Sequence, residues 1–270
     1  MAQAWRLILD GKLDGPCNMA TDETLLYAYE ATGIPALRIY GWQAPYISLG
    51  YNQDPEQVLK KGRTTAFVRR LTGGSAILHD QEITYSVCCL RQDLNLSIRV
   101  KDSYRELCVF LIDFYRRLGL RARFARDVGE LKGFGHYGNF CFSSCEHFDL
   151  VIGGRKIGGN AQRRRHDLIF QHGSIPQTLD FSRIRACIND EHINPHVCGA
   201  LDILLGRPTD FSRLQEMLAE SFRETFSLDC QPSALTSHEA DTRDYLVTAK
   251  YSSPAWNYHR ENVSIDPVRL

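Results

Sequence analysis

The spacing of apolar residues along the chain predicts several amphipathic helices. Apolar positions recur three and four residues apart over residues 102–118, and Gly119 follows them, which is the pattern of a helix that buries one face. A similar stripe follows Asp210. Further helices are predicted over residues 18–32 with Asn18 as a cap, from Asp54-Pro55 to Gly62, and from the capping-box pattern Thr236 to Glu239.

Short runs of β-type sequence lie between these helices. They follow no regular strand–helix–strand order, so we expect a mixed α+β fold with a largely antiparallel sheet packed against helices. Gly153-Gly154 suits a two-residue hairpin turn. One domain is expected over residues 1–250, followed by a C-terminal tail over residues 251–270. The predicted strands are residues 5–9, 36–40, 46–49, 65–69, 76–78, 83–90, 148–152 and 168–171.

Composition narrows the class of protein. The 270 residues are 43% hydrophobic and 24% charged, with 32 basic and 32 acidic residues, which fits a globular protein and argues against a broad nucleic-acid-binding surface. No apolar run approaches the ~18–20 residues that span a bilayer, and the N-terminus lacks the features of a secretory signal. We therefore expect a cytoplasmic protein that binds neither membranes nor nucleic acid.

The nine cysteines contain no Cys-x-x-Cys pair. Zinc sites of the usual kind are built from such pairs, so no metal site is expected. Most of these cysteines are expected to pack as small buried hydrophobes. At most one or two of the cysteines are expected to have a chemical role in the active site.

Three glycine-containing segments place polar side chains next to a bare backbone. Residues 69–80 contain Arg70 before a Gly-Gly pair, residues 153–162 contain Lys156, and residues 171–175 contain His172. Backbone beside glycine approaches a ligand closely, so each segment is a candidate binding element. Each also has an ordinary explanation, namely a hairpin turn, a solvated lysine and a core histidine.

A loop-like stretch presents two cysteines just before the lysine segment. Residues 133–145 are rich in glycine and aromatic residues and contain Cys141 and Cys145. A nearby ammonium such as that of Lys156 favours the thiolate, which is the nucleophilic form of cysteine. Cys141 and Lys156 are therefore a candidate acyl-accepting pair, and local chemistry leaves Cys145 as an alternative.

In their order along the chain, these segments resemble the biotin/lipoate A/B protein ligase family. The resemblance rests on RRLTGGSAILHD (69–80), GRKIGGNAQ (154–162) and QHGSI (171–175), supported by residues 18–23, 48–53 and 82–87 and more weakly by residues 250–256. It covers about residues 5–180. Ser75 and Asn160 depart from the residues usual in the family, and the loop at 129–139 is unusual for it.

Within this family the chain is most similar to the cysteine-dependent octanoyl-[acyl carrier protein]:protein octanoyltransferases. In that branch a Cys-Phe pair stands nine residues before a leucine of the strand that leads to the lysine. Cys141-Phe142 has this spacing from Leu150. The resemblance therefore favours Cys141 over Cys145 as the nucleophile.

The resemblance implies a transferase of lipoate biosynthesis. Cys141, with Lys156 beside it, would take an octanoyl group from octanoyl-acyl carrier protein, and a lysine of a lipoyl domain or of the glycine-cleavage H protein would accept it. No cofactor is required for that reaction. The implied acyl- and substrate-binding residues are Arg70, Gly73, Gly74, Ser75, His79, Gly158, Gly159, Asn160, Ala161, His172, Gly173 and Ser174.

Two alternatives remain at this point. An ATP-dependent lipoate–protein ligase would form lipoyl-AMP, would require ATP and Mg²⁺, and would not need Cys141. A relative that binds lipoyl groups without turnover would need neither a nucleotide nor Cys141. For either enzyme, the run Arg163-Arg164-Arg165 is a candidate docking patch for an acidic partner, or an ordinary solvated turn.

Overall fold

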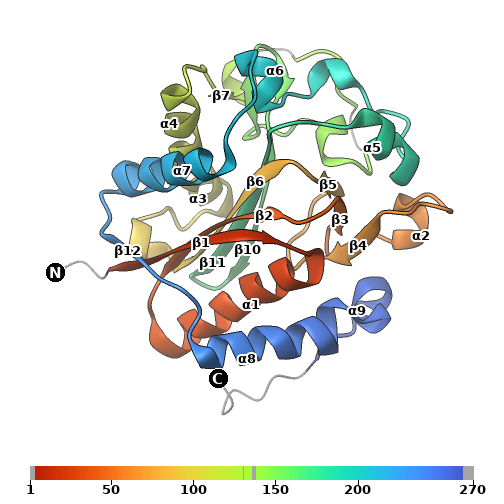
Figure 1. Ribbon diagram of the computed structural model, residues 1–270. Helices are drawn as coiled ribbons and strands as arrows, with labels where there is room; N and C mark the ends of the chain where they lie inside the picture. Colours follow the sequence, from red (N-terminus) through yellow and green to blue (C-terminus); the bar gives the residue numbers. More distant parts are fainter. Residues whose placement is uncertain (1–3, 130, 136–137, 264–270) are drawn as a thin grey trace.

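The computed structural model describes residues 4–129, 131–135 and 138–263. Its centre is a six-stranded sheet (Figure 1) with the order β10-β11-β6-β2-β1-β12. The pairs from β10 to β2 are antiparallel, whereas β1 runs parallel to both β2 and β12. The predicted mixed, largely antiparallel sheet packed against helices is confirmed. The strands are β1 (Trp5–Leu13), β2 (Ala36–Trp42), β6 (Glu82–Leu90), β10 (Gly159–Arg165), β11 (Leu168–Pro176) and β12 (Cys230–Pro232).

Two small sheets lie beside the central one. The first has the order β4-β3-β5 and the second the order β7-β8-β9. Gly153 and Gly154 have φ values of 58° and 78° and join β8 to β9, as the hairpin prediction requires. The strands are β3 (Tyr46–Leu49), β4 (Ala66–Arg69), β5 (Ile77–His79), β7 (Arg123–Phe124), β8 (Leu150–Ile152) and β9 (Arg155–Lys156).

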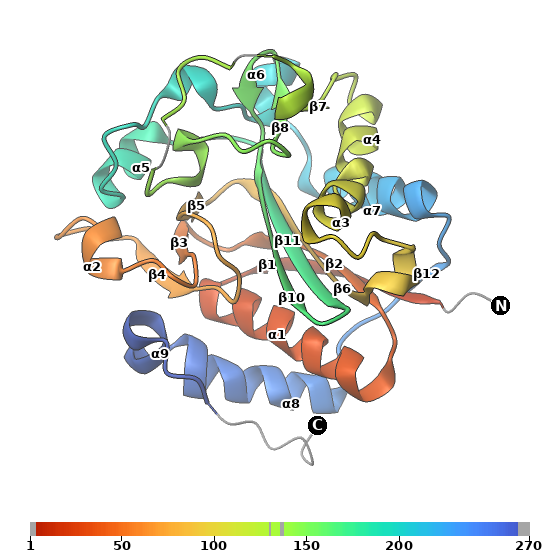
Figure 2. The same ribbon diagram turned by 180° about the vertical axis from the view of Figure 1, so that it is seen from behind.

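Helices cover both faces of the central sheet (Figures 1 and 2). Helices α1 (Gly15–Thr32), α8 (Ser237–Leu246) and α9 (Pro254–His259) lie on one face, and α3 (Val100–Leu107), α4 (Val109–Arg117) and α7 (Phe211–Phe226) lie on the other. The largest core cluster packs α4 and α7 against the sheet. Shorter helices are α2 (Pro55–Val58), α5 (Phe181–Cys187), α6 (Leu201–Leu205), η1 (Arg91–Leu94), η2 (Ala125–Asp127), η3 (Cys141–Ser143) and η4 (Pro195–Val197).

Three predicted helices differ in detail from the structure. The one predicted from Asp54-Pro55 to Gly62 is only the four-residue α2, which ends at Val58. The one predicted over residues 18–32 begins at Gly15 because the side chain of Asp14, not that of Asn18, accepts the capping hydrogen bond from the backbone N–H of Cys17 at 2.8 Å. Asn18 is buried and donates to the carbonyl oxygen of Gly41 instead. The helix predicted over 102–118 is two helices, α3 and α4, because the backbone turns at Cys108.

The C-terminal end packs onto the domain beyond residue 250. A π-helical turn, η5 (Val247–Tyr251), continues α8 and leads to α9, where Trp256 is 2% exposed. Residues 251–259 are therefore part of the packed fold and not a tail, because Tyr251 and Trp256 belong to the core cluster that packs against α1. His136 and Tyr137 of the predicted loop, and residues 264–270, lie outside the described residues. No helix within the described part of the chain is long and apolar enough to cross a membrane.

Candidate active site

Two cavities meet at Cys141. The inner pocket has an apolar wall formed by Met19, Tyr40, Trp42 and Ile77. The outer cleft is lined by exposed residues such as Lys101 and Glu146 and opens beside α3. Of the predicted site residues, Arg70, His79, Gly159, His172, Gly173 and Ser174 line the inner pocket, Gly73, Ser75 and Lys156 line the outer cleft, Gly74, Cys141, Asn160 and Ala161 line both, and Gly158 lines neither.

The register of the central sheet builds the floor of the inner pocket. Tyr40 pairs with Thr84, Thr84 pairs with Ser174, and Ser174 pairs with Gly159. Directly paired residues in adjacent strands point to the same face, so one row across four strands faces the pocket. Gly158 supports this row through its backbone, since its φ is 116° and a Cβ there would lie 2.5 Å from the carbonyl oxygen of Ser174.

Cys141 is the first residue of the turn η3, and its backbone position is fixed by a hydrogen bond and by its two buried neighbours in the chain. Its backbone N–H donates to the carbonyl oxygen of Ala76 at 2.9 Å, and its neighbours Phe140 and Phe142 are both 1% exposed. A Cβ on Gly159 would lie 2.6 Å from the Cys141 sulfur. The glycine therefore allows the thiol to lie directly against the backbone of β10.

Lys156 is buried beside this turn. Its ammonium donates to the carbonyl oxygens of Cys141 at 2.8 Å and of Ser144 at 3.1 Å, and forms an ion pair with Asp149 at 2.7 Å. Burial lowers the pKa of Lys156, but the Asp149 carboxylate beside it outweighs burial, so the pKa is raised overall. Lys156 is therefore a permanent cation that holds the loop carrying the thiol.

Sequence reasoning missed Asp149, although a signal for it was present. The two-residue turn places Val151 opposite Lys156, and a diagonal neighbour two residues along the strand lies within reach of a long side chain. That diagonal neighbour is Asp149. The hairpin predicted from Gly153-Gly154 therefore implied the ion pair.

Arg70 is a second buried cation, and it shapes the glycine turn. It donates to the carbonyl oxygens of Ser48, Gly73 and Ser75 at 2.7–3.0 Å. No carboxylate pairs with it in the part of the chain that the structure describes. Burial lowers the pKa of Arg70 to about 10, which leaves it charged at neutral pH with only neutral acceptors around it.

His79 belongs to a polar wall of the inner pocket. Its ring stacks on Trp42 with a centroid distance of 3.8 Å, and its two nitrogens lie 2.8 Å from Glu82 Oε1 and from Ser48 Oγ. The hydroxyl of Ser174 donates to Glu82 Oε2 at 2.8 Å. This wall of the inner pocket is therefore polar, and each of these side chains has a hydrogen-bond partner within the wall.

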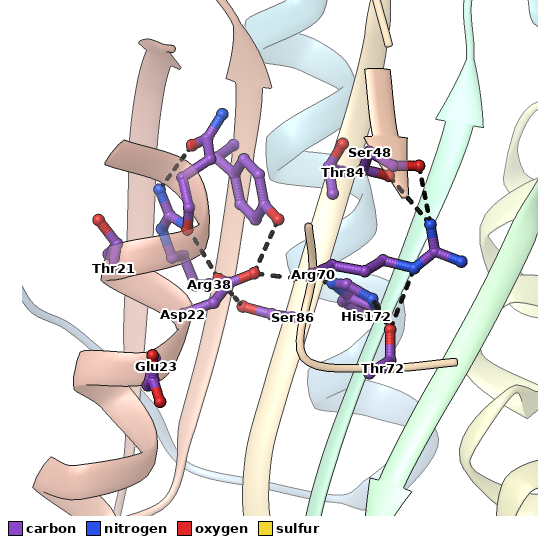
Figure 3. Close-up of polar contacts among 12 residues, drawn as sticks. Thr21, Asp22, Glu23, Arg38, Ser48, Arg70, Thr72, Thr84, Ser86 and His172 are labelled. Carbon is purple, nitrogen blue, oxygen red and sulfur yellow. Dashed lines mark hydrogen bonds and ion pairs between the residues drawn. The ribbon is translucent and has the colours of Figure 1, made fainter. Parts of the chain in front are cut away.

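His172 links the pocket to a buried charge cluster below α1 (Figure 3). Its Nε2 lies 2.6 Å from Thr72 Oγ1, and its Nδ1 lies 3.8 Å from Asp22 Oδ2. Burial lowers the pKa of His172 below its usual value, so the imidazole is neutral at pH 7. Asp22 also accepts hydrogen bonds from Arg38 at 2.8 Å and from Ser86 at 2.8 Å.

The remaining candidates have distinct surroundings. Ser75 donates to the carbonyl oxygen of Gly138 at 2.7 Å, and Asn160 accepts from the Tyr85 hydroxyl at 2.9 Å. Cys145 lines neither cavity, and burial raises its pKa to about 12. Of the arginine run, Arg163 and Arg165 line a different cavity, beside α1.

Comparisons with known proteins agree with the resemblance found in the sequence. Residues 14–223 match the lipoyl protein ligase A/B catalytic domain. The chain is 35% identical over 277 residues to the octanoyltransferase LipM of Kyrpidia tusciae, covering 96% of this chain and 100% of that protein. It is 32% identical over 279 residues to the octanoyltransferase LipM of Bacillus subtilis, covering 96% and 99%.

A solved structure shares the fold. The putative lipoate protein ligase of T. acidophilum with bound lipoic acid superposes with a TM-score of 0.76 at 23% identity, covering 95% of this chain and 100% of that chain. A lipoate-protein ligase A bound with ATP gives a TM-score of 0.78 at 23% identity. With a matching domain over most of its length and full-length relatives above 30% identity, the chain belongs to the lipoyl protein ligase A/B family.

Proposed function

We propose that the chain is an octanoyltransferase that carries the octanoyl group on Cys141 between a carrier protein and a lysine of a lipoyl domain or H protein. The observation that carries the proposal is the position of Cys141 at the junction of an apolar pocket and an open cleft. An acyl chain in the inner pocket would place its carboxyl carbon at the thiol. The donor and the acceptor would then reach that carbon, one after the other, through the outer cleft.

The reaction proceeds in two balanced steps. The Cys141 sulfur bonds to the thioester carbon of the donor, and the carbon–sulfur bond to the carrier breaks, so the carrier leaves as a thiol with the proton from Cys141. The acceptor amine then bonds to the same carbon, and the bond to Cys141 breaks, which regenerates the thiol and leaves an amide. A thioester is converted into a more stable amide, so the reaction requires no nucleotide.

Buried cations flank the reacting carbon in this arrangement. Lys156 and Arg70 would stabilise the oxyanion that forms in each step, aided by backbone N–H groups of the Gly73-Gly74 turn and of residues 158–161. His172, which is neutral, is placed to orient Thr72 and the floor of the pocket. Preorganised charge of this kind acts strongly because Lys156 and Arg70 are buried, each only 3% exposed.

Intact-mass spectrometry after mixing with octanoyl-acyl carrier protein tests the proposal. We expect an octanoyl adduct that maps to Cys141, forms without ATP, is absent in Cys141→Ala and persists in Cys145→Ala. A protein that only binds lipoyl groups would form no adduct. Acceptor modification that strictly requires ATP and survives Cys141→Ala would instead establish a lipoate–protein ligase.

A further inference from the structure

The backbone that leads into the turn η3 is held by side chains from distant parts of the chain. Each backbone polar group from the carbonyl oxygen of Asn139 to that of Cys141 has a hydrogen-bond partner. These partners belong to the turn itself and to four other segments, and they are Ser143, Gln53, Ala76, Lys156 and Asp190. Reacting groups work well only when their supports fix them to within about 0.5 Å. Two of these partners, Gln53 and Asp190, have no other part in the site.

Asp190 lies in the segment that follows α5, beside the loop that carries Cys141 (Figure 2). One carboxylate oxygen accepts from the backbone N–H of Phe140 at 2.8 Å, and the other accepts from the backbone N–H of His192 at 2.8 Å. Gly138 allows this approach, because a Cβ there would lie 2.6 Å from Asp190 Oδ2. Asp190 is therefore a hydrogen-bond acceptor for the backbone next to the nucleophile.

Gln53 reaches the same loop from the turn between β3 and α2. Its Nε2 donates to the carbonyl oxygen of Asn139 at 3.1 Å, and its Oε1 accepts from the backbone N–H of Gly50 at 3.0 Å. Gly50 lies against the glycine turn of the site, since a Cβ on it would lie 1.8 Å from the carbonyl oxygen of Gly74. Gln53 therefore links that glycine turn to the loop that carries Cys141.

We propose that Gln53 and Asp190 are positioning residues for acyl transfer, which hold the Cys141 thiol between the inner pocket and the outer cleft. This inference rests on the proposed function. Neither side chain lines the inner pocket or the outer cleft, so both act through the backbone of the loop. Such supports matter because a displacement of about 1 Å at the reacting groups can slow a reaction by about 10²-fold.

Replacements of similar shape separate hydrogen bonding from packing. Asp190→Asn keeps an oxygen for the N–H of Phe140 and gives up only the bond to His192, which is exposed to water. Gln53→Glu replaces the donor nitrogen by an oxygen that faces the carbonyl oxygen of Asn139. We therefore expect Asp190→Asn to behave as wild type, and Gln53→Glu to be as slow as Gln53→Ala. Asp190→Ala should also be slow.

Asp180→Ala is the matched control for Asp190→Ala. Asp180 also accepts from a backbone N–H, that of Arg183 at 3.0 Å, and it caps α5 without contacting the loop. Loss of this carboxylate should therefore leave acyl transfer unchanged.

Two rates at Cys141 are measured and normalised to the folded fraction. One is acylation by octanoyl-pantetheine, a thioester donor without a carrier protein, and the other is alkylation by iodoacetamide, which requires no bound acyl chain. For Asp190→Ala, Gln53→Ala and Gln53→Glu we expect kcat for acylation to fall about tenfold or more, with KM within a few-fold of wild type. Alkylation should stay within a few-fold of wild type in every variant.

Three results would overturn the positioning proposal. They are acylation at the wild-type rate in both alanine variants, an equal fall in acylation and alkylation, and a loss in Asp190→Asn as large as that in Asp190→Ala. The proposed function fails in a different way, because the wild type itself would then take no octanoyl group from octanoyl-pantetheine or from octanoyl-acyl carrier protein.

Discussion

Two lysines are almost fully buried, and each forms an ion pair with a carboxylate, but their surroundings differ. Lys156 is 3% exposed and pairs with Asp149 at 2.7 Å, and Lys250 is 1% exposed and pairs with Glu23 at 2.8 Å. The ammonium of Lys250 lies 4.0 Å from the ring centre of Trp256, among aromatic side chains. That of Lys156 instead donates to carbonyl oxygens of the loop that carries Cys141.

The partners of the two carboxylates complete the contrast. Glu23 also accepts hydrogen bonds from Tyr27 at 3.1 Å and Tyr251 at 2.8 Å, so the pair joins α1 to the C-terminal helices. Its contribution to the site is indirect, because Trp256 donates to the backbone oxygen of Arg69, next to Arg70. The same kind of ion pair thus stabilises helix packing in one region and holds the loop that carries Cys141 in the other.

Replacement of Lys156 is expected to have the largest effect. Lys156→Met removes the cation that the proposed mechanism places beside the reacting carbon, and loss of one such stabilising group typically lowers kcat by about 10²–10³-fold. It also leaves Asp149 buried and unpaired, which destabilises the fold. The double variant Lys156→Met, Asp149→Asn should recover the free energy of unfolding, measured in urea, but not kcat. Recovery of both would show that Lys156 is only structural.

Replacement of Lys250 should affect stability alone. Lys250→Met leaves Glu23 uncompensated, which typically costs about 3–5 kcal/mol of unfolding free energy. The matched double variant Lys250→Met, Glu23→Gln should restore most of it. Acylation of Cys141, normalised to the folded fraction from circular dichroism, should remain within a few-fold of wild type. A loss as large as that of Lys156→Met would remove the distinction between the two lysines.

Alkaline pH should distinguish the two ion pairs, because only the contribution of Lys250 to stability is expected to change below pH 10.5. Burial lowers the pKa of Lys250 below 10.5 despite Glu23, so as the pH rises towards 10.5 the unfolded chain holds more protons at this group and its contribution to stability rises. The pKa of Lys156 is raised, so its contribution stays constant until the pH exceeds 10.5. Urea unfolding at pH 8 and pH 10, referenced to each neutral double variant, measures the difference, and identical pH slopes would contradict it.

Local features of the site were predictable, and distant pairings were not. The glycine turns, the β8–β9 hairpin and the order Cys141 before Lys156 follow from short stretches of sequence. The cluster around His172 depends on sheet register, in which Arg38 pairs with Ser86 and Ser86 with His172. Residues this far apart meet only after β2, β6 and β11 have paired, and no local pattern in the chain determines which strands pair.

The smallest expected effect concerns the capping box of α8, on the Lys250 side of the comparison. The Thr236 side chain accepts from the backbone N–H of Glu239, whose carboxylate accepts from the backbone N–H of Thr236. Thr236→Ala removes the first bond and should lower the unfolding free energy by about 1 kcal/mol. Thr236→Ser, which keeps the hydroxyl, is the control. Because α8 supports packing and does not contact Cys141, kcat should be unchanged, and a fall in kcat would show that the C-terminal helices take part in the chemistry.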